Sequence, residues 1–223
     1  MSKTVFLWDI DGTLLLTGGA GGLAFENVFF ELYGVKDIWS KIEPDGRTDD
    51  SILEEIYFNR FRQMPTLDEK KQIEELYSIK LPEALKTATR FRLMPHVPEV
   101  LKYLHSLAHV SMGLATGNYE RAAHHKLVRA GLRSYFDYGG YGSDSADREV
   151  LTRLALTRAT QYLKTSPKKV IVVGDTIHDV RCGLAIGAKT LAVCTGRTKA
   201  ETLKDAGATW VIPDLSHFPS ECC

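Results

Sequence analysis

Five short apolar runs, each followed by a turn and most of them by a helical pattern, constrain the fold of this chain most strongly. The runs are TVFLWD at 4–9, HVSMGLAT at 109–116, KKVIVVGD at 168–175, KTLAVCTG at 189–196 and TWVIPD at 209–214. Helical patterns are expected at about 98–108, 119–130, 147–163, 178–186 and 198–206. Strands that alternate with helices in this way are typical of a parallel sheet covered on both faces. The sequence therefore predicts an α/β core.

Residues 17–90 interrupt the alternation with three helical stretches and no convincing strand. A cluster of glycines marks the first border of this insertion, and Pro95 and Pro98 follow the second, so both borders suit hinges. We expect a helical domain at 17–90, inserted after the first strand. The α/β core domain is then expected at 1–16 and 91–223.

Composition narrows the possible functions and the cellular compartment. The chain has 28 basic and 28 acidic residues, so its summed charge favours neither nucleic acid nor a membrane surface as a partner. The apolar stretch in MSKTVFLWD is too short for a signal peptide or a membrane span. The four cysteines show neither CxxC spacing nor a disulfide framework. We expect a cytoplasmic protein, either monomer or homodimer.

Polar residues close three of the apolar runs. Asp9 and Asp11 follow the first, the triplet Thr116, Gly117 and Asn118 follows the second, and Asp175 ends the third with Asp179 beyond it. The carboxyl ends of parallel strands meet at one edge of a sheet, where ligands bind. Four carboxylates and one hydroxyl are therefore expected to converge there. Such a cluster is unfavourable without a hard cation, and oxygen ligands suit Mg²⁺.

A carboxylate cluster around Mg²⁺ favours chemistry on phosphate, because the cation bridges a carboxylate and a phosphoryl oxygen. One aspartate of the first pair can act as nucleophile and form an aspartyl phosphate. The other can protonate the leaving oxygen and later accept a proton from water. Two aspartates so close in sequence would then have different tasks on one phosphate group.

With these residues placed, the chain resembles the haloacid dehalogenase-like hydrolase superfamily, and within it the phosphatases with a helical cap after the first strand. DIDGTL resembles the first motif of that family, LATGN the second and GDTIHD the fourth. The resemblance implies a Rossmann-like core and an Mg²⁺-dependent phosphatase of a small phosphorylated metabolite. Phosphoglycolate is the leading named substrate by resemblance alone, and sugar phosphates and nucleoside monophosphates stay open.

The resemblance also implies a role for each residue that matches a motif. Asp9 would be the nucleophile and a metal ligand, and Asp11 the general acid/base that also ligates through its backbone carbonyl. Thr116, with a neighbouring backbone N–H, would hold the phosphoryl group, and the motif extends this substrate-binding role to Gly117 and Asn118. Asp175 would bind the metal. Asp179 would complete the acidic cluster through a water or by orienting a basic partner.

The third motif departs from the family pattern, because its usual lysine has no clear match. Arg148 stands where that lysine is expected, and its forked guanidinium could neutralise the nucleophile and phosphate. An ordinary residue at a helix start is the alternative. Lys164, Lys168 and Lys169 lie too near the next strand, and His178 is interpreted as structural.

The stretch GRTDDSI in the insertion opens a helix and offers a natural anion site. By resemblance, Arg47 would read the far end of the substrate, and a helix cap with a solvated arginine is the alternative. The insertion also carries four aromatic residues that we expect to pack its interior rather than bind a ring. These are Phe25, Phe29, Phe30 and Tyr33.

Three other functions compete with the phosphatase. A β-phosphoglucomutase-like phosphomutase would shield the aspartyl phosphate from water and require a bisphosphate activator. A dehalogenase needs neither Asp11 nor a metal cluster, because a halide leaves without a proton. A non-catalytic binding protein on the same fold is the remaining alternative, and it predicts the loss of a carboxylate that this chain retains.

Overall fold

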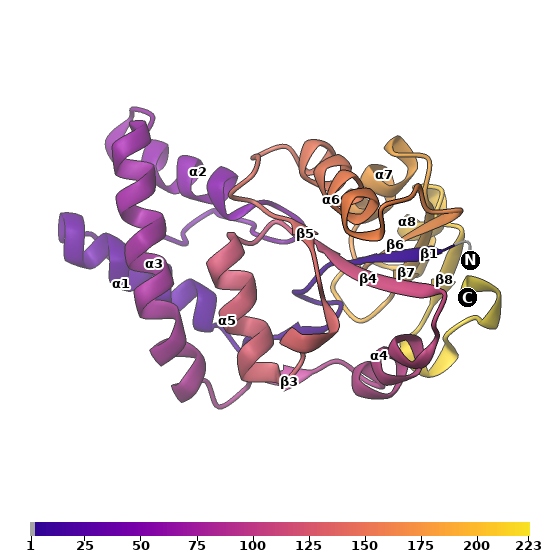
Figure 1. Cartoon of the computed structure of the whole chain (residues 1–223). Coiled ribbons are helices and arrows are strands. Elements are labelled where there is room, and N and C mark those ends of the chain that lie inside the picture. The colour runs from indigo at the N-terminus through magenta and orange to yellow at the C-terminus, as the bar shows by residue number, and fades with distance from the viewer. Residues whose placement is uncertain (1–2) are drawn as a thin grey trace.

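The computed structural model describes residues 3–223, which form a six-stranded sheet with helices on both faces and a group of three helices beside it (Figure 1). The sheet order is β5-β4-β1-β6-β7-β8, and all pairs are parallel. The strands are β1 (Thr4–Trp8), β4 (Val110–Ala115), β5 (Gly139–Gly140), β6 (Lys169–Gly174), β7 (Lys189–Val193) and β8 (Trp210–Ile212). This architecture confirms the predicted α/β fold.

The core helices lie close to their predicted positions. They are α4 (Val97–Ser106), α5 (Glu120–Ala130), α6 (Arg148–Leu163), α7 (Ile177–Ala185) and α8 (Ala200–Asp205). Short 3₁₀ turns occur at Arg133–Tyr135, Leu215–His217 and Ser220–Cys222. Within residues 3–223, no helix combines the length and the apolar character needed to cross a membrane.

Strand β1 lies at the centre of the sheet, and its side chains alternate between the two faces. Phe6 and Trp8 belong to the apolar cluster that includes Leu101 of α4, whereas Val5 and Leu7 belong to the cluster that includes Ala155 of α6. All four β1 side chains are fully buried. A strand with both faces covered must be apolar throughout, which explains the unbroken TVFLW run.

The register of β1 fixes which polar residues meet. Trp8, the last residue of β1, pairs with Leu114 of β4 on one side and with Val173 of β6 on the other. The chain segments that follow these three positions therefore leave the sheet at the same edge. Asp9, Thr116 and Asp175 lie within two residues of those positions.

The inserted segment forms α1 (Ala20–Tyr33), α2 (Asp49–Phe61) and α3 (Leu67–Thr87), which pack around an apolar cluster that also includes Tyr119 and Ala122 at the start of α5. An antiparallel pair joins this group to the core. It consists of β2 (Leu15–Leu16) and β3 (Arg92–Leu93), with Leu15 opposite Leu93. The chain thus leaves and re-enters the core through two adjacent short strands.

The four aromatic residues of α1 do not all have the predicted environment. Phe25 and Phe29 are buried in the cluster of the inserted helices, and Tyr33 packs against it. Phe30 is 51% exposed, so the expectation that it packs the interior is wrong. It follows Phe29 on the helix and so points about 100° away from it, where Lys36 Nζ lies 4.8 Å from the ring centroid.

Candidate active site

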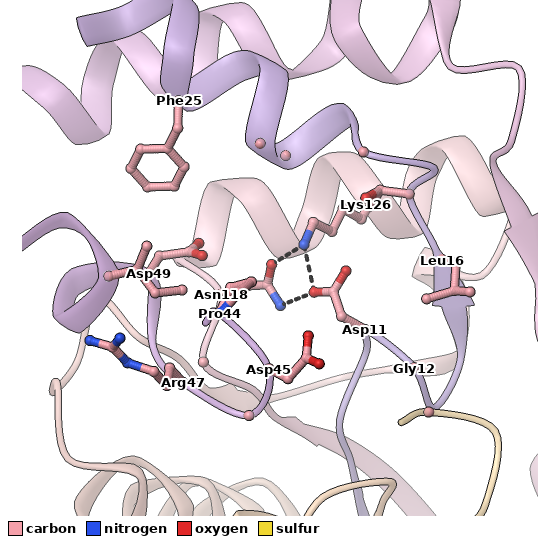
Figure 2. Close-up of a pocket in the computed structure, with 18 of the residues that line it drawn as sticks. Asp11, Gly12, Leu16, Phe25, Pro44, Asp45, Arg47, Asp49, Asn118 and Lys126 are labelled. Carbon is pink, nitrogen blue, oxygen red and sulfur yellow. Dashed lines mark hydrogen bonds and ion pairs between the residues drawn. The ribbon is translucent and has the colours of Figure 1, made fainter. Parts of the chain in front are cut away.

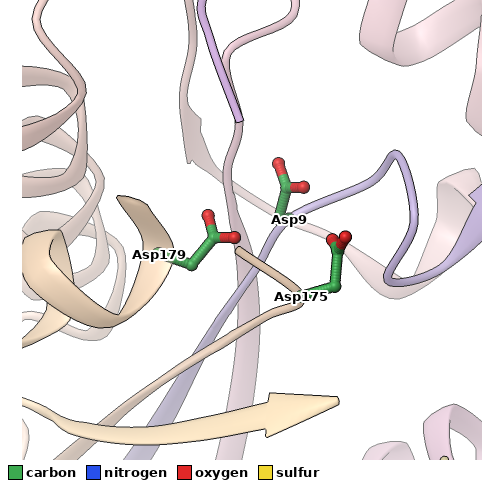
Figure 3. Close-up of side chains that lie close together, drawn as sticks. All are labelled: Asp9, Asp175 and Asp179. Atoms are coloured by element: carbon green, nitrogen blue, oxygen red, sulfur yellow. The ribbon is translucent and has the colours of Figure 1, made fainter. Parts of the chain in front are cut away.

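Three carboxylates meet at the carboxyl edge of the sheet (Figure 3). Asp9 follows β1, Asp175 follows β6, and Asp179 lies in the first turn of α7. One ligand oxygen from each lies within 4.8 Å of the others, and all three residues are buried. The structure therefore brings these three carboxylates together at one edge of the sheet.

Local hydrogen bonds hold the second and third carboxylates in place. The Thr13 hydroxyl donates to Asp175 Oδ1 at 2.9 Å. At the start of α7, the Thr176 backbone N–H and hydroxyl donate to Asp179 Oδ2 at 3.0 and 2.7 Å, and the Asp179 N–H donates back to the Thr176 hydroxyl. This capping box orients Asp179 toward the sheet edge.

Two glycines leave the space that Asp175 occupies. A Cβ on Gly12 would lie 2.4 Å from Asp175 Oδ2, and a Cβ on Gly196 would lie 1.7 Å from the same atom. Gly12 also has a φ of +85°, a conformation that residues with a Cβ rarely adopt. The turns after β1 and β7 can therefore approach the Asp175 carboxylate only because Gly12 and Gly196 lack side chains.

The carboxylate cluster is under electrostatic strain without a cation. Burial and the Asp179 charge raise the pKa of Asp9 to about 7, although Arg148 opposes the shift. Burial and the charges of Asp179 and Asp9 raise the pKa of Asp175 to about 8. Buried carboxylate oxygens within reach of one ion are the type of donor that a hard divalent cation prefers. The residues present therefore fit Mg²⁺.

Arg148 is the first residue of α6, whose N-cap is Asp147. Its Nη2 donates to Asp179 Oδ1 and lies 3.5 Å from Asp9 Oδ1. Its Nη1 donates to the Gly46 carbonyl of the inserted segment at 3.2 Å, and its buried Nε has no partner among residues 3–223. The guanidinium predicted from sequence thus lies against the nucleophile candidate.

The group of carboxylates whose oxygens lie within 4.8 Å of one another includes Asp9, Asp175 and Asp179 but not Asp11, which differs from the expected convergence of four. Figure 2 shows Asp11 beside Asn118 and Lys126. Its Oδ2 accepts hydrogen bonds from Asn118 Nδ2 at 2.8 Å and Lys126 Nζ at 2.6 Å. Asn118 Nδ2 also donates to the hydroxyl of the buried Thr116 at 2.7 Å. Asp11 turns away because a lysine and an amide from the core attract it.

Gly117 lines the cavity and contacts the inserted segment through its carbonyl group. Its carbonyl accepts a hydrogen bond from the Asp49 N–H at 2.7 Å, and a Cβ on Gly117 would lie 2.2 Å from the Arg47 carbonyl oxygen. The Asp49 carboxylate in turn accepts from the Tyr119 N–H at 2.8 Å. Burial raises the pKa of Asp49 to about 6, opposed by the Lys126 charge.

Arg47 lines the same cavity, but its guanidinium has partners on α2. Nη1 pairs with Glu55, and Nη2 donates to the Ser51 carbonyl at 2.9 Å. The side chain is 28% exposed. The structure therefore places Arg47 at the cavity in an ion pair, and not as a freely solvated arginine.

A cavity of about 750 Å³ joins the carboxylate edge to the inserted helices. Its walls combine acidic, basic and aromatic side chains, and glycines form its border near α1. Among the lining residues are Asp9, Asp11, Asn118, Lys126, Arg148, Asp175, Phe25, Trp39 and Tyr77. A volume of this size suits a small organic ligand.

Lys126 and Asp49 were not identified from the sequence as site residues. Lys126 shares the buried face of α5 with Ala122, Ala123 and Leu127. A lysine at that helical spacing within an apolar face is a signal for a buried, paired charge. Asp49 offers a weaker signal, because an aspartate in the first turn of a helix is common for local reasons.

The chain belongs to the haloacid dehalogenase-like hydrolase family, whose model matches residues 3–187. This match includes the segments that carry Asp9, Thr116, Arg148 and Asp175. The family assignment and the parallel sheet agree with the resemblance found in the motifs.

Two curated relatives match nearly the whole chain. It is 24% identical over 201 residues to a phosphoglycolate phosphatase of Aquifex aeolicus, which covers 87% of this chain and 86% of the relative. It is also 24% identical over 227 residues to the pyrophosphatase PpaX of Oceanobacillus iheyensis, with 96% and 94% covered. Among solved structures, CbbY from Rhodobacter sphaeroides in complex with phosphate has a similar fold, with a TM-score of 0.72, 17% identity, and 97% and 96% of the two chains covered.

Proposed function

We propose that this protein is a Mg²⁺-dependent phosphatase that hydrolyses a small phosphate monoester through an aspartyl-phosphate intermediate. One observation carries the proposal: the two aspartates after β1 have different surroundings. Asp9 belongs to the buried carboxylate cluster beside Arg148, whereas Asp11 faces the cavity next to Lys126 and Asn118. The names of the two curated relatives, a phosphoglycolate phosphatase and a pyrophosphatase, support hydrolysis at a phosphoryl group.

In the first half of the reaction, an Asp9 oxygen attacks phosphorus as the bond to the leaving oxygen breaks, and Asp11 gives that oxygen a proton. In the second half, water attacks phosphorus and loses a proton to Asp11, and Asp9 and inorganic phosphate are released. When bound by Asp9, Asp175, Asp179 and the Asp11 backbone carbonyl, Mg²⁺ would neutralise charge on the phosphoryl oxygens.

Other residues near the cluster suit the binding of the phosphoryl group. The Thr116 hydroxyl and the backbone N–H groups of Gly117 and Asn118 would hold its oxygens, and Arg148 would offset its charge next to Asp9. Each of these roles is consistent with the position of the residue near the carboxyl edge of the sheet. The exposed oxygen of Asp11 would transfer the proton.

Residues 17–90 would serve as the cap that covers the substrate, and residues 1–16 and 91–223 would form the catalytic domain. Contacts of Gly46 with Arg148 and of Asp49 with Gly117 support this role, because they join the insertion to the site. Arg47 would contact the far end of the substrate.

A phosphoglycolate-like compound or a sugar phosphate is the proposed substrate. The four free cysteines support a reducing, cytoplasmic location.

The test is phosphate release from a panel of phosphate monoesters, measured with Mg²⁺ and with chelator. Turnover that needs Mg²⁺ and disappears in Asp9→Asn would support the proposal and rank the substrates. A protein that releases phosphate from no monoester of the panel, but isomerises a sugar phosphate when a sugar bisphosphate is added, would instead be a phosphomutase.

A further inference from the structure

Lys126 is a buried lysine whose partners come from outside its own helix. Only 5% of the residue is exposed, and its neighbours on the buried face of α5 are apolar. Removing an ammonium group from water is costly unless opposite charge or polar acceptors receive it. Its Nζ donates to Asp11 Oδ2 at 2.6 Å and to Asn118 Oδ1. Both acceptors belong to the candidate active site.

Lys126 fixes the orientation of the Asn118 amide. An ammonium group can only donate hydrogen bonds, so the amide oxygen of Asn118 must face Lys126. The NH₂ group of Asn118 then points the other way, where it donates to Asp11 Oδ2 at 2.8 Å and to the Thr116 hydroxyl at 2.7 Å. Lys126, Asn118 and Asp11 therefore form one closed network, in which Asn118 accepts from Lys126 and both residues donate to Asp11 Oδ2.

The network holds one oxygen of Asp11 and leaves the other open. Lys126 and Asn118 both donate to Oδ2, as the dashed lines in Figure 2 show. Oδ1 accepts no hydrogen bond from residues 3–223, and the Asp11 side chain is 41% exposed at the cavity. Two donors on one oxygen fix the plane of the carboxyl group. That plane presents Oδ1 to whatever occupies the cavity.

We propose that Lys126 is a positioning residue that, together with Asn118, aims Oδ1 of Asp11 at the leaving oxygen of the substrate. The inference rests on the proposed phosphatase function and extends it to a residue outside the recognised motifs. Lys126 itself does not transfer the proton. The proton passes from Asp11 Oδ1 to the leaving oxygen while the bond from that oxygen to phosphorus breaks and the bond from Asp9 to phosphorus forms.

If Lys126 positions Asp11, its replacement should affect two kinds of substrate differently, which is not expected if Lys126 only stabilises the fold. An alkoxide is a poor leaving group and needs the proton as the bond breaks, whereas a nitrophenolate leaves without one. A misdirected Asp11 would therefore slow the hydrolysis of an alkyl phosphate and hardly affect that of p-nitrophenyl phosphate. A change that merely loosened the fold would slow both reactions alike.

The experiment compares kcat for p-nitrophenyl phosphate with kcat for the best alkyl phosphate of the panel, in wild type and Lys126→Met. Since general acid catalysis contributes about 10²–10⁴-fold, we expect a loss of about tenfold or more on the alkyl ester and a much smaller loss on the aryl ester. Lys70→Met is the matched control, because Lys70 also pairs with carboxylates, those of Asp50 and Glu54, but lies in the inserted helices and does not line the cavity. Equal losses on both esters in Lys126→Met would overturn the proposal.

A double-mutant cycle tests whether Lys126 acts through Asp11. In an Asp11→Asn background, Lys126→Met should cause no further loss on the alkyl ester, since residues that act as one unit are not additive. A full additional loss would contradict the positioning role. If Lys126→Met does not fold, Lys126→Gln, with a shorter polar side chain, takes its place with the same expectations.

A crystal structure of the Lys126 variant gives a readout that needs no activity. We expect the Asn118 amide and the Asp11 carboxylate to leave their wild-type orientations. Unchanged orientations would overturn the proposal even if the wild-type enzyme hydrolyses neither ester. If the wild type hydrolyses neither ester, the proposed phosphatase function fails instead. Failure of the positioning role and failure of the proposed function can therefore be distinguished.

Discussion

Arg148 Nη2 lies 3.5 Å from Asp9 Oδ1 while it donates to Asp179 Oδ1. One guanidinium group therefore joins a carboxylate that follows β1 to one that begins α7. Its other terminal nitrogen reaches the Gly46 carbonyl of the inserted segment at 3.2 Å. Arg148 thus contacts the proposed nucleophile, the acidic cluster and the inserted segment together, which a lysine with one charged nitrogen would not reproduce.

Replacement of Arg148 by alanine should lower kcat by about 10²–10³-fold, the usual cost of removing one preorganised electrostatic contact. Arg148→Lys should recover part of the loss, because it restores the charge without the fork. Steady-state phosphate release is the measurement. Arg158→Ala is the matched control, since Arg158 pairs with Asp144 at 2.6 and 2.7 Å outside the cavity. Near-normal turnover of Arg148→Ala would rule out its assigned role.

The carboxylate cluster predicts an unusual dependence of stability on pH. The pKa of Asp9 is raised to about 7 and that of Asp175 to about 8, first by burial and then by the Asp179 charge. Unfolded aspartates lose their protons at about pH 4. Between the pKa of the unfolded aspartates and the raised pKa values of Asp9 and Asp175, the folded, metal-free protein binds more protons than the unfolded chain. Its free energy of unfolding should therefore fall as the pH rises from about 4 to 8.

Thermal unfolding in chelator at a series of pH values measures this effect. The contribution of the cluster should be lost toward the upper end of the range, and Mg²⁺ should raise Tm most at that end, because a ligand bound only by the folded state stabilises it. Asp175→Asn removes one of the repelling charges, so its Tm should vary less with pH and respond less to Mg²⁺. A wild-type response to Mg²⁺ in this variant would argue against the proposed metal site.

A Gly117→Ala substitution should disturb the contact between the insertion and the core. The new Cβ would lie 2.2 Å from the Arg47 carbonyl oxygen, a backbone atom that can move only with its segment. We expect the hydrogen bond from the Asp49 N–H to the Gly117 carbonyl, 2.7 Å long here, to break. Hydrogen exchange at the Asp49 amide should accelerate and kcat/KM should fall. Unchanged exchange there would show that the segment accommodates the methyl group.

The sequence predicted the sheet because its buried strands are continuous apolar runs, such as TVFLW and VIVV. It did not reveal β2, β3 and β5, which have two residues each and therefore no readable periodicity. Strand β5 consists of Gly139 and Gly140, residues with low strand propensity. A Cβ on Gly140 would lie 1.9 Å from the Leu151 carbonyl oxygen. Close packing of β5 against α6 therefore explains why position 140 is a glycine.

In the site too, the sequence predicts what depends on neighbouring residues and does not predict what depends on tertiary contacts. Asp9 and Asp175 are recognisable because each ends a strand, and strand ends share an edge. The orientation of the Asp11 side chain depends on Lys126, which lies 115 residues further along the chain. A short sequence motif does not specify a contact with a residue so far away in the sequence. The contact of Arg47 with Gly117 likewise depends on how the inserted helices lie on the core.

Arg47 provides the last prediction, because its ion pair with Glu55 separates two roles. If Arg47 contacts the far end of the substrate, Arg47→Ala should raise KM severalfold and change kcat little, as expected for lost ground-state binding. Glu55→Gln keeps the guanidinium but removes its charged partner on α2. It should leave KM unchanged or lower it, because Arg47 becomes free to meet an anionic group. Michaelis constants for the best substrate of the panel measure both effects. An equal rise of KM in both variants would mean that the ion pair shapes the start of α2 and that Arg47 does not contact the substrate.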